Sequence, residues 1–223
     1  MLNAPLRVFF LLSVLIPAVS AAAGEAGVEK LAERLGNSSK EVRRQAAFEL
    51  ARLGQEAKPA LGALVKALGD RDQQVLFQVA RALAGIGPAA APAVGGLVKN
   101  LKSRDRQVSY RSAYALGRIG GPAVPALIEV LGSSSSRARA AAARALSWVK
   151  PPPADAAERL VGALGDDDND VRRNASEALG SYGAPVAPRL AEALMSKNVM
   201  IRRGASRALS LMGSGAKPAA GAL

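Results

Sequence analysis

Apolar positions recur along this chain with one irregular period from about residue 27 to its end. Successive members of one apolar column, which we call the anchors, are 33, 33, 30, 33 and 30 residues apart. Two leucine columns, which start at Leu35 and Leu50, advance by the same steps. Three columns that share one irregular set of steps indicate a tandem array of about six units of 30–33 residues. The anchors are Val42, Val75, Val108, Ala138, Val171 and Ile201.

Each unit predicts a second helix that begins just before its anchor. Apolar residues stand at the anchor and 4, 8 and 11 positions later, as in Val42, Ala46, Leu50 and Leu53, which places them on one helical face. A good N-cap residue lies three positions before every anchor: Ser39, Asp72, Asp105, Ser135, Asp168 and Asn198. In five units the helix is expected to end at a glycine, namely Gly54, Gly87, Gly120, Gly183 or Gly213.

A first helix precedes each polar turn and carries paired apolar residues such as Leu64 and Val65. It is expected to begin near a proline, because a helix needs no amide donor in its first turn. The prolines at equivalent places are Pro59, Pro92, Pro122 and Pro185. Two helices per unit predict an all-α fold for the repeated part of the chain.

The repeat unit resembles a known family. Segments such as DRDQQVLFQVARALAGIG and DDDNDVRRNASEALGSYG are similar to the short HEAT-like repeats of the phycobilisome lyase type. The resemblance covers residues 27–223 and implies a right-handed α-solenoid, in which neighbouring units complete each other's core. The closing KPAAGAL nearly copies KPALGAL at 58–64, so six units are followed by a partial seventh. This repeat serves many unrelated roles, so the resemblance implies the fold rather than the ligand.

The first 23 residues are typical of a secretory signal peptide. Arg7 precedes an apolar run over residues 8–19, and small residues follow it. Cleavage is expected after Ala21 or Ala23, which leaves residues 24–223 as the solenoid domain of a periplasmic or extracellular protein. An uncleaved anchor is the disfavoured alternative, because the run is shorter than the roughly 20 residues of a spanning helix and contains Pro17. We therefore do not expect an integral membrane protein.

Residues with catalytic or metal-binding chemistry are scarce. The sequence has no His and no Cys, which removes the usual nucleophile–base pairs and most transition-metal sites. HEAT-repeat deoxyhypusine hydroxylases hold iron with His-Glu pairs, and this chain has none of those histidines. The acidic run 166–170 lacks the spacing and closing Glu of an EF-hand loop. We predict a protein that is not an enzyme and has no cofactor, no metal site and no catalytic residue.

The position directly after the anchor is often arginine, at Arg43, Arg139, Arg172 and Arg202. It lies beside the core stripe and near the acidic helix caps. The favoured interpretation is structural: a ladder of arginines that contact aspartates and backbone carbonyls between units.

The face of the second helix opposite the core stripe gathers aromatic residues and arginines. Five of the six aromatics after the signal segment lie 2, 6 or 10 positions after an anchor, and only Tyr182 falls on a core position. Aromatic and arginine side chains are enriched at binding hot spots. The HEAT resemblance implies that the second helices line the concave side of the solenoid. The predicted ligand-binding residues on this side are Phe77, Arg81, Tyr110, Arg111, Tyr114, Arg118, Arg144 and Trp148. The alternative is that these rings pack sideways between neighbouring second helices.

The charge balance widens the choice of partner. Lys and Arg number 30 against 18 Asp and Glu, which gives a net charge of +12. This surplus suits an anionic partner, although it is also explained by solubility. We predict an exported interaction scaffold that binds a protein segment, with an anionic glycan or lipid as a further candidate. The alternatives are a nucleic-acid-binding HEAT-like protein, which export disfavours, and an accessory or lyase-like enzyme component.

Overall fold

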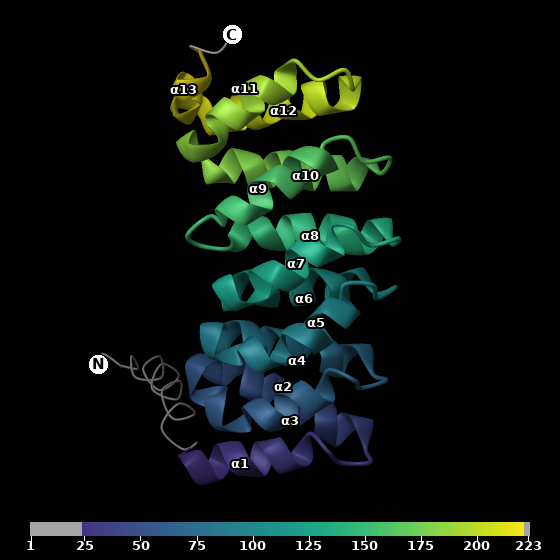
Figure 1. Cartoon of the computed structure of the whole chain (residues 1–223). Helices are drawn as coiled ribbons and strands as arrows, with labels where there is room; N and C mark the ends of the chain where they lie inside the picture. The colour runs from purple at the N-terminus through teal and green to yellow at the C-terminus, as the bar shows by residue number, and fades with distance from the viewer. Residues whose placement is uncertain (1–23, 221–223) are drawn as a thin grey trace, which may run out of the picture.

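A computed structural model describes residues 24–220, and within them the chain forms a stack of antiparallel helix pairs without strands (Figure 1). The predicted signal peptide, residues 1–23, lies outside the described residues. In the stack, α1 (Glu25–Arg34) lies at one end and α13 (Lys217–Ala220) at the other. The six predicted helix pairs are confirmed, and α13 stands where a seventh unit would begin.

The helices divide into two sets. The first helices are α1, α3 (Leu61–Ala67), α5 (Val94–Asn100), α7 (Val124–Val130), α9 (Ala154–Ala163) and α11 (Ala187–Leu194). The second helices are α2 (Lys40–Leu53), α4 (Gln73–Ile86), α6 (Arg106–Ile119), α8 (Ser136–Trp148), α10 (Asn169–Tyr182) and α12 (Val199–Met212).

The second helices begin and end where the sequence predicts. All six predicted N-caps occupy the cap position, and the carboxylates of Asp72, Asp105 and Asp168 each accept hydrogen bonds from two backbone amides. Ser39 differs, because its hydroxyl donates to Glu41 instead. The five predicted glycines follow the helix ends with φ between 55° and 75°, a conformation that other residues rarely adopt.

The four prolines lie before the first α-helices rather than in their first turns. They stand in 3-10 turns that precede the first α-helices: η1 (Gly54–Ala60), η2 (Gly87–Ala93), η3 (Gly121–Ala123) and η4 (Ala184–Val186). The turns η1 and η2 have seven residues and accompany 33-residue steps, whereas η3 and η4 have three and accompany the 30-residue steps. The irregular period of the sequence is therefore set largely by the length of these turns.

The leucine and alanine columns form one continuous core. Leu83, Leu116, Leu146 and Leu179 are fully buried, and Tyr182 is 4% exposed, as its core position predicts. Small residues let the second helices approach closely. A Cβ added to Gly117 of α6 would lie only 2.7 Å from the Cβ of Trp148 in α8.

The arginine ladder predicted between units is confirmed for two of the four arginines. Arg43 pairs with Asp70 of the next unit at 2.6 Å, and Arg139 pairs with Asp166 at 2.7 Å. Arg172 and Arg202 donate instead to backbone carbonyls of their own turns. All four arginines donate to carbonyls of their own turns, and the two that also bridge units do so where the following turn contains an aspartate.

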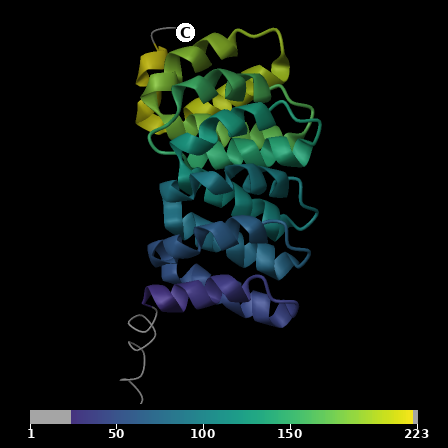
Figure 2. The ribbon, with the colours of Figure 1, turned by 60° about the horizontal axis from the view of Figure 1, so that its bottom comes forward.

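The second helices pack against one another more closely than the first helices do. They share one surface, which we call the second-helix face, defined by the outward residues of α2, α4, α6, α8, α10 and α12. Figure 2 shows the same stack of layers from a direction turned by 60°. In a curved solenoid, the more closely packed layer of helices is expected on the inner, concave side. The predicted ligand-binding residues belong to these helices, so they lie on the second-helix face.

One helical stretch of the described residues, Gln73–Asn100, is long and apolar enough to cross a membrane. It consists of α4, η2 and α5 rather than one straight helix, and Gly87 interrupts it at φ 71°. Val75, Leu83 and Leu97 within it are fully buried in the solenoid core. Its hydrophobicity is therefore that of core helices.

Candidate functional site

The aromatic residues predicted to bind ligand form one connected cluster across α4, α6 and α8. Trp148 meets the rings of Tyr110 and Tyr114 edge to face, with centroids 5.6 and 5.3 Å apart. The Arg111 guanidinium lies 4.9 Å from the Phe77 ring centre, close enough for a cation–π contact. The rings therefore pack against neighbouring helices while part of their surface stays accessible, and Tyr110 is the most open at 39% exposure.

The predicted arginines occupy two different settings. Arg111 and Arg144 are half-buried and belong to the cluster, since Arg144 lies 5.7 Å from the Tyr110 ring centre. Arg81 and Arg118 are exposed and make no hydrogen bond or ion pair with any residue in 24–220. Six of the eight predicted site residues are thus linked by ring and cation–π contacts, whereas Arg81 and Arg118 stand one helical turn after Phe77 and Tyr114 without such a contact in the described residues.

A row of hollows runs along the second-helix face. The central one, of about 360 Å³, is lined by α6, α8 and the start of α10. A second, of about 350 Å³, lies between α2 and α4, and a third, of about 250 Å³, lies between α10 and α12. All three are lined only by second helices and their caps, mostly near the helix N-termini. Equivalent positions in successive units therefore leave equivalent spaces.

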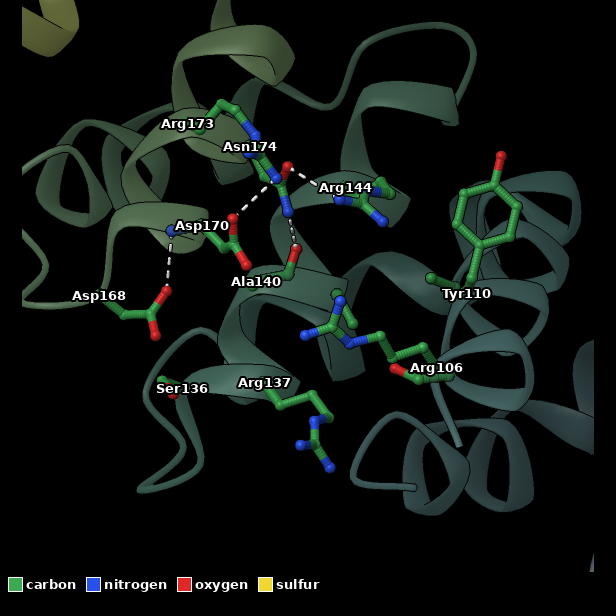
Figure 3. A pocket seen from close by; sticks show the side chains of 13 residues that line it. Arg106, Tyr110, Ser136, Arg137, Ala140, Arg144, Asp168, Asp170, Arg173 and Asn174 are labelled. Atoms are coloured by element: carbon green, nitrogen blue, oxygen red, sulfur yellow. Dashed lines mark hydrogen bonds and ion pairs between the residues drawn. The ribbon is translucent and has the colours of Figure 1, made fainter. Parts of the chain in front are cut away.

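The central hollow has an alanine floor and polar walls (Figure 3). Ala113 is fully buried, and Ala140 and Ala141 are nearly so, so short side chains create the space. Tyr110 and Arg106 of α6 stand on one side, and α10 provides the other. Because the rim is polar and the floor apolar, the hollow suits a side chain with an apolar stem and a polar end.

Arginines outnumber acids around this hollow. It is lined by Arg106, Arg137, Arg144 and Arg173 and by the carboxylates of Asp168 and Asp170. Arg173 pairs with Asp170 at 2.8 Å. Arg137 donates to the backbone carbonyl of Ser103 at 3.0 Å, whereas Arg106 makes no hydrogen bond or ion pair in the described part of the chain.

Asp168 is occupied as the cap of α10. Its carboxylate accepts hydrogen bonds from the amides of Asp170 and Val171 at 2.8 and 3.2 Å. Burial raises the pKa of Asp168, but the amide of Val171, the Ser136 hydroxyl and the amide of Asp170 outweigh it, so the pKa falls below its usual value. The charge is therefore retained and satisfied by the protein itself.

Asn174 fixes the α8–α10 side of the hollow. Its side-chain amide donates to the backbone carbonyl of Ala140 at 2.8 Å, and its oxygen accepts from Arg144 at 3.3 Å. Asn174 is 1% exposed, so it orients Arg144 rather than meeting a ligand. The α8–α10 wall is thus held in place before any partner arrives.

Two arginines that line the central hollow were not among the residues predicted from the sequence. Arg106 and Arg137 stand two and one positions before their anchors, outside the offsets that define the predicted face. The signal that could have found them is the alanine-rich stretch of α8, where Ala140 and Ala141 leave room for neighbouring arginines. Tyr110 and Arg144 are shared between the predicted set and the hollow.

No group of three or more acidic residues within 24–220 is arranged to hold a metal ion. The acidic run before α10 is already used: Asp166 pairs with Arg139 at 2.7 Å, and Asp168 caps the helix. These contacts give Asp166 and Asp168 a structural role, which for Asp168 is the predicted helix cap.

Comparison with known proteins places the fold. The HEAT-repeat family model matches residues 28–100, 92–180 and 157–223. The archaeal HEAT-like repeats protein from Thermococcus onnurineus NA1 is similar over 86% of this chain and 89% of its own, with 14% identity and a TM-score of 0.56. An engineered protein is similar over 84% of this chain and 98% of its own, with 25% identity and a TM-score of 0.50.

A designed armadillo repeat protein is also similar, over 83% of this chain and 99% of its own, with 19% identity and a TM-score of 0.50. None of the curated proteins matches the sequence. Likeness at these identities shows a shared repeat architecture and not a shared function.

Proposed function

The chain belongs to the HEAT-repeat family, and we propose that it is an exported, non-catalytic scaffold that holds an extended protein segment on its second-helix face. Solenoids of this kind are typical of interaction scaffolds, because stacked units offer a long continuous surface. The observation that carries the proposal is the row of three hollows, all lined by second helices. Repeated hollows suit a partner that is itself a repeating chain.

The spacing of the solenoid supports an extended segment. Packed helices lie about 10 Å apart, and an extended chain rises about 3.3 Å per residue, so about three residues would pass each unit. The aromatic cluster around Trp148 adjoins the central hollow through Tyr110. An apolar residue of the partner can lie against these rings while its neighbours reach the hollows.

The site chemistry favours binding over catalysis. The sequence has no His or Cys to act as a nucleophile or base, and the acids around the central hollow are a helix cap and an ion-paired residue. Export is proposed from residues 1–23, whose character is that of a secretory signal. Location outside the cytoplasm also removes most contact with nucleic acid.

A displayed library of random peptides, selected on residues 24–223, tests the proposal. We expect enriched peptides whose binding is lost in Tyr110→Ala/Tyr114→Ala/Trp148→Ala of unchanged helicity. The matched control is Lys66→Ala/Lys99→Ala/Arg159→Ala, which removes exposed side chains from first helices. Failure to enrich any peptide, or equal binding by the aromatic variant, would contradict the proposed function.

A further inference from the structure

We propose that the central hollow binds the carboxylate of a Glu or Asp side chain of the partner segment, with Arg106 and Arg137 as its main donors. The inference rests on the proposed function and adds the chemistry that the segment must carry. Around the hollow, both carboxylates are bonded within the protein, whereas several arginine donors are not.

The arginines retain unused hydrogen-bond donors. Arginine has five N–H donors, and a carboxylate takes two of them in a bidentate pair. Arg106 has no hydrogen-bond partner within residues 24–220, and the only bond of Arg137 there is one donated to the Ser103 carbonyl. Figure 3 shows the Arg106 side chain directed from α6 into the space toward α8.

The acids of the hollow are engaged with other groups. Asp168 accepts two backbone amides, and Asp170 pairs with Arg173 at 2.8 Å. Four arginines against two carboxylates leave a positive balance around the hollow, and on the α6 and α8 side it is carried by Arg106, Arg137 and Arg144. One anionic group entering between them would be attracted without displacing an internal ion pair.

The shape of the hollow favours a side chain. Its volume of about 360 Å³ exceeds that of one residue, and its floor is formed by Ala113, Ala140 and Ala141. The methylene groups of a Glu side chain can lie on these methyl groups while the carboxylate meets the guanidinium groups above. Burial of apolar stems beside a charged end is a common recognition pattern.

The distribution of charge favours a peptide over a continuous polyanion. The hollow between α2 and α4 is lined by three glutamines, Phe48 and the carboxylate of Glu41, and its Arg44 is paired with Asp72 at 2.9 Å. Among these three hollows, arginines without an ion pair in the described residues therefore line only the central one and the one between α10 and α12. A polymer charged at every unit would meet an amide-lined hollow at the other end, whereas a peptide can place its acids locally.

The single Trp of the chain reports on this site. Trp148 contacts Tyr110, and Tyr110 lines the hollow, so occupation of the hollow is expected to change the emission of Trp148. The probes are a capped peptide of repeated Glu-Ser-Phe, its Gln-Ser-Phe counterpart of equal length, and heparin. Each is titrated into wild type, Arg106→Gln/Arg137→Gln and the control Lys99→Gln/Arg159→Gln, which loses the same charge from first helices.

We expect the Glu peptide to bind about tenfold more tightly than the Gln peptide, as the gain of one charge-assisted pair implies. This preference should be lost in the Arg106/Arg137 variant and kept in the control. Arg106→Gln alone, at an exposed side chain without partners, repeats the test should the double variant not fold.

Equal affinity for the two peptides would overturn the carboxylate assignment and leave the proposed function standing. Tighter binding of heparin than of the Glu peptide would also overturn it, in favour of a polyanion surface. Binding of neither peptide would refute it as well, while the library selection decides separately whether any protein segment binds.

Discussion

At the residue scale, most local choices in this chain have a single structural reason. The cap residues could be predicted from their position alone, because a short polar side chain three residues before a buried anchor has few other uses. The five glycines could be predicted in the same way, and their positive φ values show why no other residue stands there. Asp70 lies 27 residues after Arg43, in the turn of the next unit, so the pair joins neighbouring units.

Asp72 combines a helix cap with an ion pair, so its substitution separates the two. Hydrogen bonds from Arg44 lower the pKa of Asp72 to about 2, and the amides of Val75 and Gln74 add to the effect against the opposing influence of burial. We expect Asp72→Ala to lower the free energy of unfolding by about 1–3 kcal/mol, and Asp72→Asn by less, because Asn still caps. Urea unfolding near neutral pH measures both.

The lowered pKa of Asp72 also predicts how the free energy of unfolding depends on pH. A carboxyl group whose pKa is lower in the folded state stabilises the fold above its ordinary pKa and loses this contribution as the pH falls toward about 2. The difference in unfolding free energy between wild type and Asp72→Asn should therefore shrink below about pH 4. Asp167→Asn, at an exposed residue that is not a cap, is the control. A difference that stays constant down to the folded pKa would refute the role of the charge.

At the element scale, the packing of second helices decides where the site lies, and this could not be read from the chain. The helical period identifies the face of each helix, but the offset between neighbouring helices depends on which small residues meet. Trp148 lies over Gly117, and this contact brings its ring beside Tyr110 and Tyr114. The central hollow likewise arises from short side chains on α6 and α8 together, which neither segment reveals alone.

Gly117 is expected to be required for the approach of α6 to α8. An added Cβ would lie 2.7 Å from the Trp148 Cβ and 2.9 Å from the Ala145 carbonyl oxygen, and neither atom can move independently of the α8 backbone. Gly117→Ala should therefore cost about 1–3 kcal/mol in unfolding free energy, more than the roughly 1 kcal/mol gained in helix propensity. Thermal and urea unfolding measure the change, and the emission of Trp148 should shift.

Gly162 of α9 provides the comparison, because an added Cβ there meets nothing within 4 Å. Gly162→Ala should stabilise the protein by up to about 1 kcal/mol. Equal stabilisation by both alanines would show that α6 and α8 are not held by this close contact.

At the scale of the whole molecule, the repeat made the solenoid predictable, since three columns with one set of steps admit few other folds. The partner was not predictable, because a repeat architecture specifies a surface rather than its ligand. The composition predicted an excess of positive charge but not its location. In the structure, arginines with unused hydrogen-bond donors line the central hollow.

The proposed export predicts where the mature chain begins. Protein recovered from the producing cells should begin after Ala21 or Ala23, and its mass should lack the preceding residues. Intact-mass spectrometry of the secreted or periplasmic fraction measures this. Recovery of the full-length chain in the membrane fraction would favour the uncleaved anchor instead.

The central claim is that a protein segment lies along the second-helix face, and photo-crosslinking tests it most directly. A photoreactive residue replaces exposed Phe48 or Tyr110 on this face, or exposed Lys99 on a first helix, and a library-selected peptide is added. We expect peptide crosslinks from positions 48 and 110 and none from position 99. Crosslinks from position 99 alone, or equally from all three, would contradict it.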